Sequence, residues 1–276
     1  MKNVKLMFFL LLVVVILGGT LSCKINKKPS ADASVFHKII SKKLGVVSIT
    51  FDDGSKSIYQ NGFPILKKYG MPATLFLITK YTGEDVYYVD WNQVNTLVNH
   101  GWEIGSHTNT HPHLTKLTND QIKNELDESI KTLHQHGLFP KAFSSPYGDF
   151  NERVLKLVRE RFSSHRKAWD EKESVEHGFN SLESFDAFRI SNLNLTHNMS
   201  VEDIKVKILK AANEKKWLVF LLHSIKKGDA SEYQFNAEKL EQVVKYISKL
   251  VQSGKLEVKT ISQMVVKQEK EREEKQ

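Results

Sequence analysis

The sequence predicts an α/β fold with a mostly parallel sheet that closes, or nearly closes, into a barrel. Apolar runs alternate with amphipathic stretches along the chain, which is the pattern of repeated strand–helix–strand units. Polar residues follow two of these runs at their C-terminal ends, where barrels of alternating strands and helices carry catalytic groups. The runs that we expect to form strands are Val46–Phe51, Ala73–Ile78, Trp102–Ser106, Ala142–Ser145, Ser164–Trp169, Phe188–Ile190, Trp217–Leu222 and Leu256–Ile261.

The N-terminal segment has the features of an export signal. Lys2 and Lys5 precede an apolar run, Leu6–Leu17, that is shorter than the roughly 20 residues of a membrane-spanning helix. We therefore predict a signal peptide over residues 1–22, followed by Cys23 as the acylated residue of a lipoprotein. A cysteine beside an ordinary cleavage site and an uncleaved anchor are the alternatives. All three place the following domain outside the cytoplasm, and the first anchors it by lipid to a bacterial membrane.

Composition divides the remainder of the chain into three parts. Residues 23–35 are polar and form an expected tether, residues 36–266 have the length of one α/β domain, and residues 267–276 form a charged tail, typical of a solvated end. Cys23 is the only cysteine, so no disulfide can form within the chain. The net charge is +8, but no basic stripe is interleaved with aromatic residues, which argues against nucleic acid as a partner. The sequence does not predict the oligomeric state.

Helix signals lie between the apolar runs. Thr118 and Gln121 form a capping-box pair, Ser200 with Asp203 opens a second helix, and Asn236 precedes a third that Gly254 would end. The stretch Lys172–Asp186 has no clear period, and we expect a long loop there.

Two short segments carry the chemistry. Asp52-Asp53-Gly54 ends the first apolar run, and His107 and His111 follow the third. One aspartate and two histidines form a facial set of ligands for a divalent metal ion, and the second aspartate remains free as a base. Pro112 disfavours helical geometry at His111, so a turn should present the histidines. The pattern indicates a metal-dependent hydrolase.

With these residues in view, the sequence resembles the polysaccharide deacetylases of the NodB-homology type, carbohydrate esterase family 4. The resemblance covers roughly residues 45–265, and it implies a single-domain, distorted (β/α)7 barrel, NodB-like, with its site at the strand C-termini. The motifs that carry it are Thr50-Phe51-Asp52-Asp53-Gly54, His107-Thr108-Asn109-Thr110-His111, Ser145-Pro146-Tyr147-Gly148 and Leu221-Leu222-His223-Ser224.

The resemblance implies a role for each motif residue. Asp53, His107 and His111 would hold the metal ion, with Zn²⁺ expected and Co²⁺, Ni²⁺, Mn²⁺ or Fe²⁺ as alternatives. Asp52 would be the general base and His223 the general acid. The backbone N–H of Tyr147 would stabilise the oxyanion, and Leu222, or its neighbour Leu221, would border the pocket for the acetyl methyl group.

One position departs from the family pattern. The third motif commonly carries an arginine that pairs with the catalytic base, and here Ser144 occupies its place. We hypothesise that Arg166 or Arg189 supplies the missing charge. The aspartate that usually orients the catalytic histidine has two candidates, Asp170 and Asp186.

The expected function is hydrolysis of N-acetyl groups on an amino-sugar polysaccharide, peptidoglycan-like or chitin-like, at the cell envelope. Two alternatives stay open, an O-acetyl esterase acting on xylan-like polymers and a glycan-binding lipoprotein with impaired catalysis. The other histidines considered are expected at the surface or in loops: His113, His134, His136, His165, His177 and His197.

Overall fold

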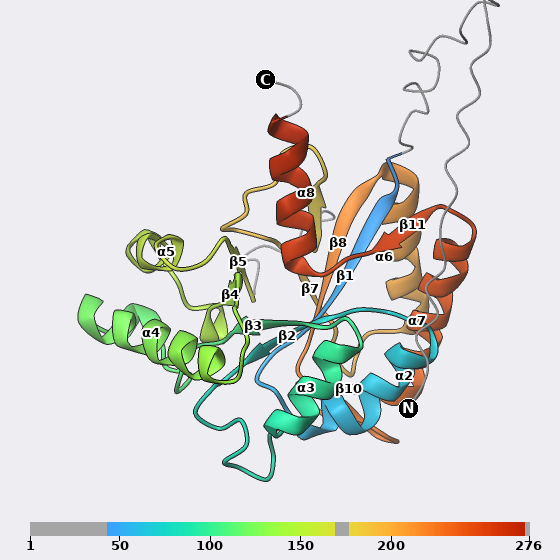
Figure 1. The fold of residues 1–276 in the computed structure, drawn as a ribbon. Helices are drawn as coiled ribbons and strands as arrows, with labels where there is room; N and C mark the ends of the chain where they lie inside the picture. The colour runs from blue at the N-terminus through green and yellow to red at the C-terminus, as the bar shows by residue number, and fades with distance from the viewer. Residues whose placement is uncertain (1–42, 169–176, 274–276) are drawn as a thin grey trace, which may run out of the picture. The chain divides into compact units, whose positions relative to one another are not determined.

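The computed structural model describes residues 43–168 and 177–273, with side chains described up to Gln268 (Figure 1). The signal peptide predicted over 1–22, Cys23, the tether over 23–35 and the candidate Asp170 lie outside the described residues. Among the described residues, no helix is both long and apolar enough to cross a membrane.

A mostly parallel sheet forms the centre of the described domain. Its strands follow the order β5-β4-β3-β2-β1-β8-β6, while β7 also pairs with β8 and β11 also pairs with β1. Every pairing in this sheet is parallel except that of β6 with β8. The strands are β1 (Gly45–Phe51), β2 (Thr74–Leu77), β3 (Glu103–Ser106), β4 (Ala142–Ser144), β5 (Ser164–Arg166), β6 (Phe179–Ser181), β7 (Leu193–Asn194), β8 (Lys216–Leu222) and β11 (Leu256–Val258).

The sheet curls around until its two ends approach each other. A parallel bridge joins Arg166 of β5 to Ile190, which lies shortly before β7. The backbone N–H of Ile190 donates to the carbonyl of His165 at 3.1 Å, and that of Lys167 donates to the carbonyl of Ile190 at 3.0 Å. Since β7 pairs with β8 and β8 with β1, seven parallel segments form a distorted barrel, and the predicted fold class is confirmed.

Helices cover the outside of this sheet (Figure 1). The capping box at Thr118 is confirmed, and Ser200 and Asn236 are the N-cap residues of their helices as predicted. The helices are α2 (Phe63–Lys68), α3 (Trp91–Asn99), α4 (Asn119–Gln135), α5 (Glu152–Arg159), α6 (Val201–Glu214), α7 (Ala237–Gln252) and α8 (Ile261–Glu273). Shorter elements are η1 (Ile58–Gly62), η2 (Leu114–Lys116), η3 (Pro146–Gly148) and a separate two-stranded sheet of β9 (Ser224–Lys226) and β10 (Gln234–Asn236).

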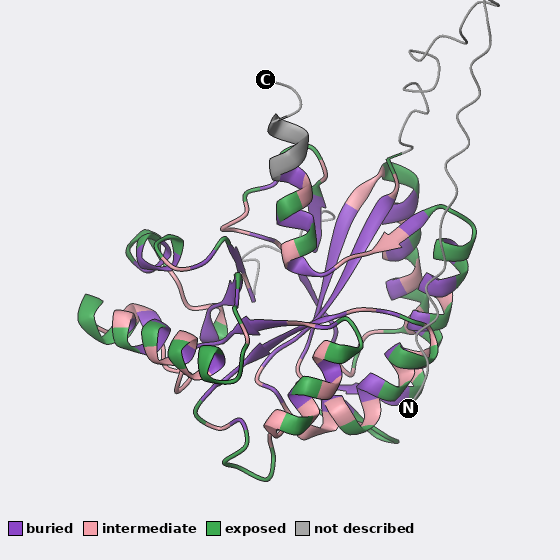
Figure 2. Cartoon of the chain, viewed as in Figure 1, coloured by how far each residue is buried: buried purple, intermediate pink, exposed green. Residues whose placement is uncertain are grey.

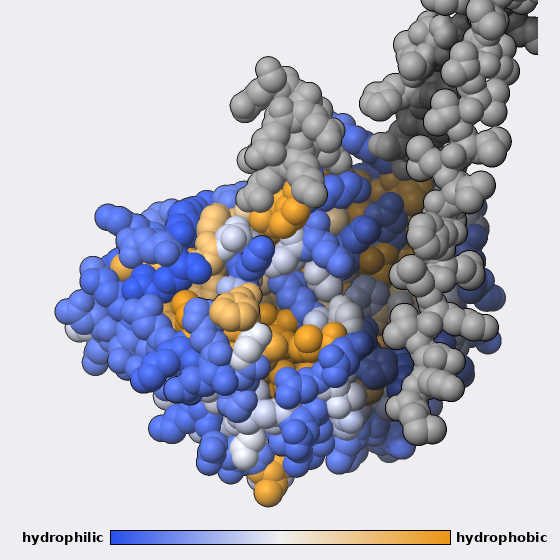
Figure 3. Space-filling view, viewed as in Figure 1, coloured by the Kyte–Doolittle hydropathy of each residue, from blue (hydrophilic) through white to orange (hydrophobic). Residues whose placement is uncertain are grey.

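Side chains alternate between the two faces of each strand, and this alternation divides the core into layers. On β8, Leu218, Phe220 and Leu222 belong to a large apolar cluster with α6 and α7. Trp217 and Val219 belong to a second cluster with residues of β1, β2 and β4, which fills the barrel interior. Figure 2 shows the strands almost wholly buried, whereas the helices alternate between buried and exposed residues. Figure 3 shows hydrophilic residues over most of the visible face.

Two expectations from the sequence need correction. The expected loop Lys172–Asp186 contains β6, which pairs antiparallel with the start of β8 and whose three residues are too few for a periodic signal. Helix α8 continues through Glu273 into the charged segment, because its Lys, Glu, Gln and Arg residues are good helix formers. Gln268 in that segment is buried and donates to the carbonyl of Phe185 at 3.2 Å, so this part belongs to the domain.

Candidate active site

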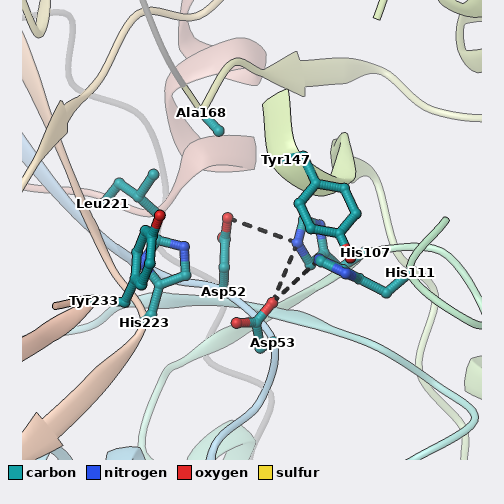
Figure 4. Close-up of a pocket in the computed structure, with 9 residues that line it drawn as sticks. All are labelled: Asp52, Asp53, His107, His111, Tyr147, Ala168, Leu221, His223 and Tyr233. Atoms are coloured by element: carbon teal, nitrogen blue, oxygen red, sulfur yellow. Dashed lines mark ion pairs between the residues drawn. The ribbon is translucent and has the colours of Figure 1, made fainter. Parts of the chain in front are cut away.

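The C-terminal ends of the strands surround a cavity of about 370 Å³ (Figure 4). It is open on one side, and residues of four sequence motifs meet in it although up to 171 positions separate them along the chain. The lining residues are Asp52, Asp53, His107, His111, Tyr147, Ala168, Leu221, His223 and Tyr233.

The backbone around the cavity adopts an uncommon conformation at several residues. Six non-glycine residues of the described chain have positive φ, and four of these line the cavity. A fifth, Thr108, lies between the two predicted histidine ligands. Left-handed backbone at non-glycine residues is strained and clusters at functional sites, so the local geometry supports this location independently of residue type. The four lining residues are Asp53 (φ 69°), His111 (φ 63°), Tyr147 (φ 57°) and Tyr233 (φ 62°).

The two adjacent aspartates directly after β1 take different environments because the backbone turns left-handed at the second of them. Asp52 follows the inward face of the strand, is 1 % exposed, and donates its backbone N–H to the carbonyl of Leu222 at 2.9 Å. The left-handed turn at Asp53 brings the next carboxylate to the rim, where its side chain is 31 % exposed. One carboxylate is thus held inside the barrel and its neighbour faces the open cavity.

The histidine pair is presented by a turn directly after β3, as Pro112 predicted. Thr108 accepts the backbone N–H of His111 on its hydroxyl at 2.9 Å, which closes the turn. His107 Nδ1 lies 2.7 Å from the carbonyl oxygen of Ser144, so this nitrogen carries the proton and donates it. The Nε2 atom of His107 is therefore free to bind a metal ion, and the carbonyl fixes the ring orientation.

The three predicted ligands converge on one point. Asp53 Oδ1 lies 3.5 Å from His107 Nε2 and 3.5 Å from His111 Nε2, and all three atoms lie within 4.8 Å of one another. Ligand atoms about 2.1 Å from a tetrahedral cation are separated by about 3.4 Å, close to these distances. One carboxylate and two imidazoles are also a suitable donor set for Zn²⁺ and related ions. The residues present therefore fit a divalent metal ion.

Without a metal ion, the three ligands shift the pKa values of one another. Burial would raise the pKa of Asp53, but the hydrogen bond and charge of His107 outweigh it and lower this pKa to about 2. Burial would lower the pKa of His107, but the nearby charges of Asp52 and Asp53 raise it. Burial and the positive charge of His107 lower the pKa of His111 to about 4. A cation bound here would displace the proton on Nε2 of the charged His107 imidazole, while Nδ1 keeps its proton. The affinity for the cation should therefore rise with pH.

A residue that the sequence analysis missed holds the histidine turn in place. Glu125 of α4 is buried and accepts the backbone N–H groups of Asn109 and Thr110 at 3.1 and 2.8 Å. It also accepts the hydroxyl of Thr110 at 2.7 Å. The available signal was a glutamate on the apolar face of a helix, next to Ile122 and Leu126, because buried carboxylates need partners.

Arg166 lies against the candidate base. Its guanidinium donates to both carboxylate oxygens of Asp52, at 2.5 Å for Oδ2, and to the hydroxyl of Ser144 at 2.8 Å. The arginine side chain is fully buried and lies over the ring of Phe76, 5.0 Å from its centroid. Arg189, the other candidate, pairs with Glu152 and Asp186 at the surface instead. Of the two arginines, the structure brings only Arg166 to Asp52.

The third motif forms the wall next to the predicted metal ligands. The ring of Tyr147 stacks on His113 at 4.1 Å and meets His111 edge-on at 4.5 Å. Ser145, two residues earlier, hydrogen bonds to Nε2 of His165 at 3.0 Å, and Nδ1 of His165 donates to the carbonyl of Phe188 at 2.9 Å. His165 is fully buried, contrary to the surface position expected from sequence, and burial lowers its pKa to about 3.

His223 lines the opposite side of the cavity, beside Leu221 and Tyr233 (Figure 4). The ring of Tyr233 meets it edge-on at 5.8 Å. The expected pocket residue Leu222 is corrected to Leu221, because alternation along β8 turns Leu222 into the outer apolar core. Asp186 pairs with Arg189 rather than with His223, so it is not the orienting carboxylate.

The fold and the site define an α/β barrel with a carboxylate–histidine–histidine centre and an adjacent buried carboxylate. A family model described as polysaccharide deacetylase matches residues 40–161. A putative polysaccharide deacetylase, YxkH, of Bacillus subtilis is 40 % identical over 116 residues, covering 41 % of this chain and 40 % of that protein. A poly-beta-1,6-N-acetyl-D-glucosamine N-deacetylase of Staphylococcus aureus is 32 % identical over 127 residues, covering 41 % of this chain and 44 % of that protein.

A similar fold occurs in a solved structure, a family 4 acetyl xylan esterase from Clostridium thermocellum in complex with a cobalt ion. Its TM-score is 0.54 with 17 % identity, covering 80 % of this chain and 90 % of that one. Residues 40–161 of the chain are thus similar to polysaccharide deacetylases, and its fold is similar to that of a family 4 carbohydrate esterase. The chain spans less than half the length of the two curated relatives named above.

Proposed function

We propose that this chain is a metal-dependent deacetylase that removes N-acetyl groups from an amino-sugar polysaccharide. The observation that carries the proposal is the convergence of Asp53 Oδ1, His107 Nε2 and His111 Nε2 beside the buried carboxylate of Asp52. A relative at 32 % identity bears the name of an N-deacetylase of poly-N-acetylglucosamine, which favours the amide over the ester as substrate.

Hydrolysis of an acetamide needs a nucleophilic water, a polarised carbonyl and a protonated leaving nitrogen. A bound divalent ion would polarise the acetyl carbonyl and lower the pKa of a neighbouring water. Asp52 accepts the proton of the attacking water, and Arg166 holds its carboxylate in place. His223, across the cavity, donates a proton to the leaving amine. Acetate and a free amino sugar result, with no net proton left on the protein.

Other side chains orient the acetyl group. Leu221 borders the cavity beside His223 and offers an apolar surface to the methyl group. The backbone N–H of Tyr147, at the left-handed turn of the third motif, is the candidate donor to the developing oxyanion. The pairing of Asp52 with Arg166 argues against the alternative of a catalytically impaired binder, because it provides the cation that the third motif lacks.

The test compares acetate release from three acetylated polymers by protein loaded with Zn²⁺ or Co²⁺. We expect release from β-linked N-acetylglucosamine oligomers or N-acetylated peptidoglycan and little from O-acetylated xylan. Asp52→Asn should abolish release while retaining the metal ion, and His111→Ala should lose the ion. Release from xylan alone would identify an O-acetyl esterase. No bound metal and no release from any polymer would support the glycan-binding alternative.

We further propose that the domain acts outside the cytoplasm, attached to a membrane by lipid on Cys23. Support comes from the sequence, in which two lysines, a short apolar run and a lone cysteine follow one another. Cells fed a labelled fatty acid should incorporate it into the protein and hold the protein in the membrane fraction. Cys23→Ser should abolish the label and release the protein. An unlabelled but membrane-bound protein would instead indicate an uncleaved anchor.

A further inference from the structure

The turn of the third motif carries backbone strain beside the predicted metal ligands. Tyr147 has left-handed backbone (φ 57°), which a non-glycine residue keeps only where its surroundings hold it. Tyr147 itself is 52 % exposed and lines the open cavity (Figure 4). Behind the turn, the carboxylate of Asp149 accepts the backbone N–H of Thr115 at 3.1 Å and its hydroxyl at 2.7 Å. These bonds fix the end of the turn that follows Tyr147.

The end that precedes Tyr147 is fixed by Ser145. This residue is fully buried, and its hydroxyl lies 3.0 Å from Nε2 of His165. Its carbonyl accepts the backbone N–H of Gly148 at 3.1 Å, and this hydrogen bond spans the turn. The position of Ser145 therefore sets the direction in which the backbone N–H of Tyr147 points.

The direction of the bond between Ser145 and His165 follows from the other ring nitrogen. Nδ1 of His165 lies 2.9 Å from the carbonyl oxygen of Phe188, which can only accept, so Nδ1 carries the proton. Burial lowers the pKa of His165 to about 3, so the ring is neutral near pH 7 and Nε2 has no proton. The hydroxyl of Ser145 therefore donates to Nε2. The ring of Phe150 meets the imidazole edge-on at 4.7 Å and limits its movement.

Strand β5 thus contacts two parts of the site from its two faces. Successive side chains of a strand point to opposite faces, so Arg166 and its neighbour His165 diverge. Arg166 points into the barrel and binds Asp52, whereas His165 accepts from Ser145 on the other face. The register between β4 and β5 pairs Ser144 with Arg166, which places Ser145 one position beyond this pair.

We propose that His165 is a positioning residue for the oxyanion donor, because through Ser145 it holds the turn that aims the backbone N–H of Tyr147. The inference rests on the proposed function and extends it to two residues that do not line the cavity. A donor to an oxyanion acts mainly in the transition state, so its displacement should lower kcat and leave KM nearly unchanged. Misplacement by about 1 Å can cost about 100-fold in rate.

Ser145→Ala tests this hydrogen bond with a small change of shape. With Zn²⁺-loaded protein and the β-linked pentamer of N-acetylglucosamine, we expect kcat to fall about 10- to 100-fold and KM to change less than about 2-fold. Ser48→Ala is the matched control, because the buried Ser48 hydroxyl donates to the carbonyl of Lys259 at 2.6 Å and accepts Nε1 of Trp217 at 2.9 Å. It lies within β1 and does not line the cavity. Its loss should lower stability to urea at least as much as Ser145→Ala does, with kcat within about 2-fold of wild type.

Two amide substitutions separate the two ring nitrogens of His165. His165→Gln places its amide near the position of Nε2 and can still accept the hydroxyl of Ser145. His165→Asn places its amide near Nδ1 and leaves that hydroxyl without an acceptor. We expect His165→Asn to lower kcat as Ser145→Ala does, and His165→Gln to keep kcat within about 5-fold of wild type. The double variant of His165→Asn with Ser145→Ala should lose no more kcat than either substitution alone, because both remove one interaction.

Hydrogen exchange reports on the turn without turnover. The amide of Gly148 should exchange about 10-fold faster in Ser145→Ala and in His165→Asn than in wild type, and at the wild-type rate in Ser48→Ala. Unchanged exchange in Ser145→Ala, or an equal loss of kcat in the Gln and Asn variants of His165, refutes the inference. If exchange rises as expected while the wild-type protein releases no acetate, the hydrogen bond stands as the support of the turn and the proposed catalysis fails.

Discussion

Replacement of Arg166 by methionine tests the most informative contact in the site. The guanidinium and the Asp52 carboxylate are almost completely buried, with side-chain exposures of 0 % and 2 %. Removal of one partner of a buried ion pair costs about 3–5 kcal/mol, because the other charge is left buried and uncompensated. Methionine can still pack on the ring of Phe76, so we ascribe this loss to the uncompensated carboxylate.

We expect Arg166→Met to lower the free energy of unfolding by about 3 kcal/mol and acetate release by about 100-fold or more, since a positioned base contributes about 10²- to 10⁴-fold. Urea unfolding and kcat/KM on an acetylated oligomer measure the two effects. Arg189→Met is the matched control, because that arginine pairs with exposed carboxylates and should cost less than about 1 kcal/mol. In the Asp52→Asn background the stability loss from Arg166→Met should shrink. Near-normal turnover and stability in Arg166→Met would refute the pairing as the support of the base.

Three further perturbations address the surroundings of the site. Glu125→Gln should weaken metal affinity about 10- to 100-fold in a competition titration, because the turn between the histidines loses its anionic acceptor; unchanged affinity would contradict this role. Burial lowers the pKa of His165 from 6.5 to about 3. Between these two pH values the unfolded chain binds a proton that the folded chain does not. The free energy of unfolding therefore falls as the pH decreases, by up to about 1.4 kcal/mol per pH unit. His165→Gln should therefore show a shallower fall of urea-unfolding free energy between pH 6.5 and 3, and an equal slope would exclude a neutral buried imidazole. Gly105→Ala would place a Cβ 2.5 Å from the ring of Phe76 and 2.9 Å from the carbonyl of Ala142, so we expect about 1–3 kcal/mol of destabilisation, and a thermal midpoint equal to wild type would show that the strands can move apart.

The strand pattern and the placement of the motifs could be predicted because each depends on local signals. Buried parallel strands are continuous apolar runs, as at Val46–Phe51 and Trp217–Leu222, and the polar residues after them fall at the same edge of the sheet. Caps such as Thr118 depend on residues three positions apart. Asp53, His107 and His111 could be proposed as one set of metal ligands because each follows the end of a recognisable strand.

The remaining features depend on contacts that sequence spacing does not encode. Glu125 falls on the apolar face of its helix, but its role follows only from how α4 packs on the turn that contains Thr110. His165 looked like a loop residue, but the bridge to Ile190 encloses it. Whether Arg166 or Arg189 would face Asp52 depended on which way a strand of three residues turns its side chains.

The support that Arg166 gives to the candidate base depends on one junction of the barrel, between β5 and the segment before β7. Arg166, which pairs with the candidate base Asp52, is also the residue whose backbone bridges to Ile190, where β5 meets the segment before β7. If this junction separates first, the guanidinium of Arg166 moves away from Asp52 while the rest of the sheet is still folded. Activity should then decline at temperatures or urea concentrations below those of global unfolding.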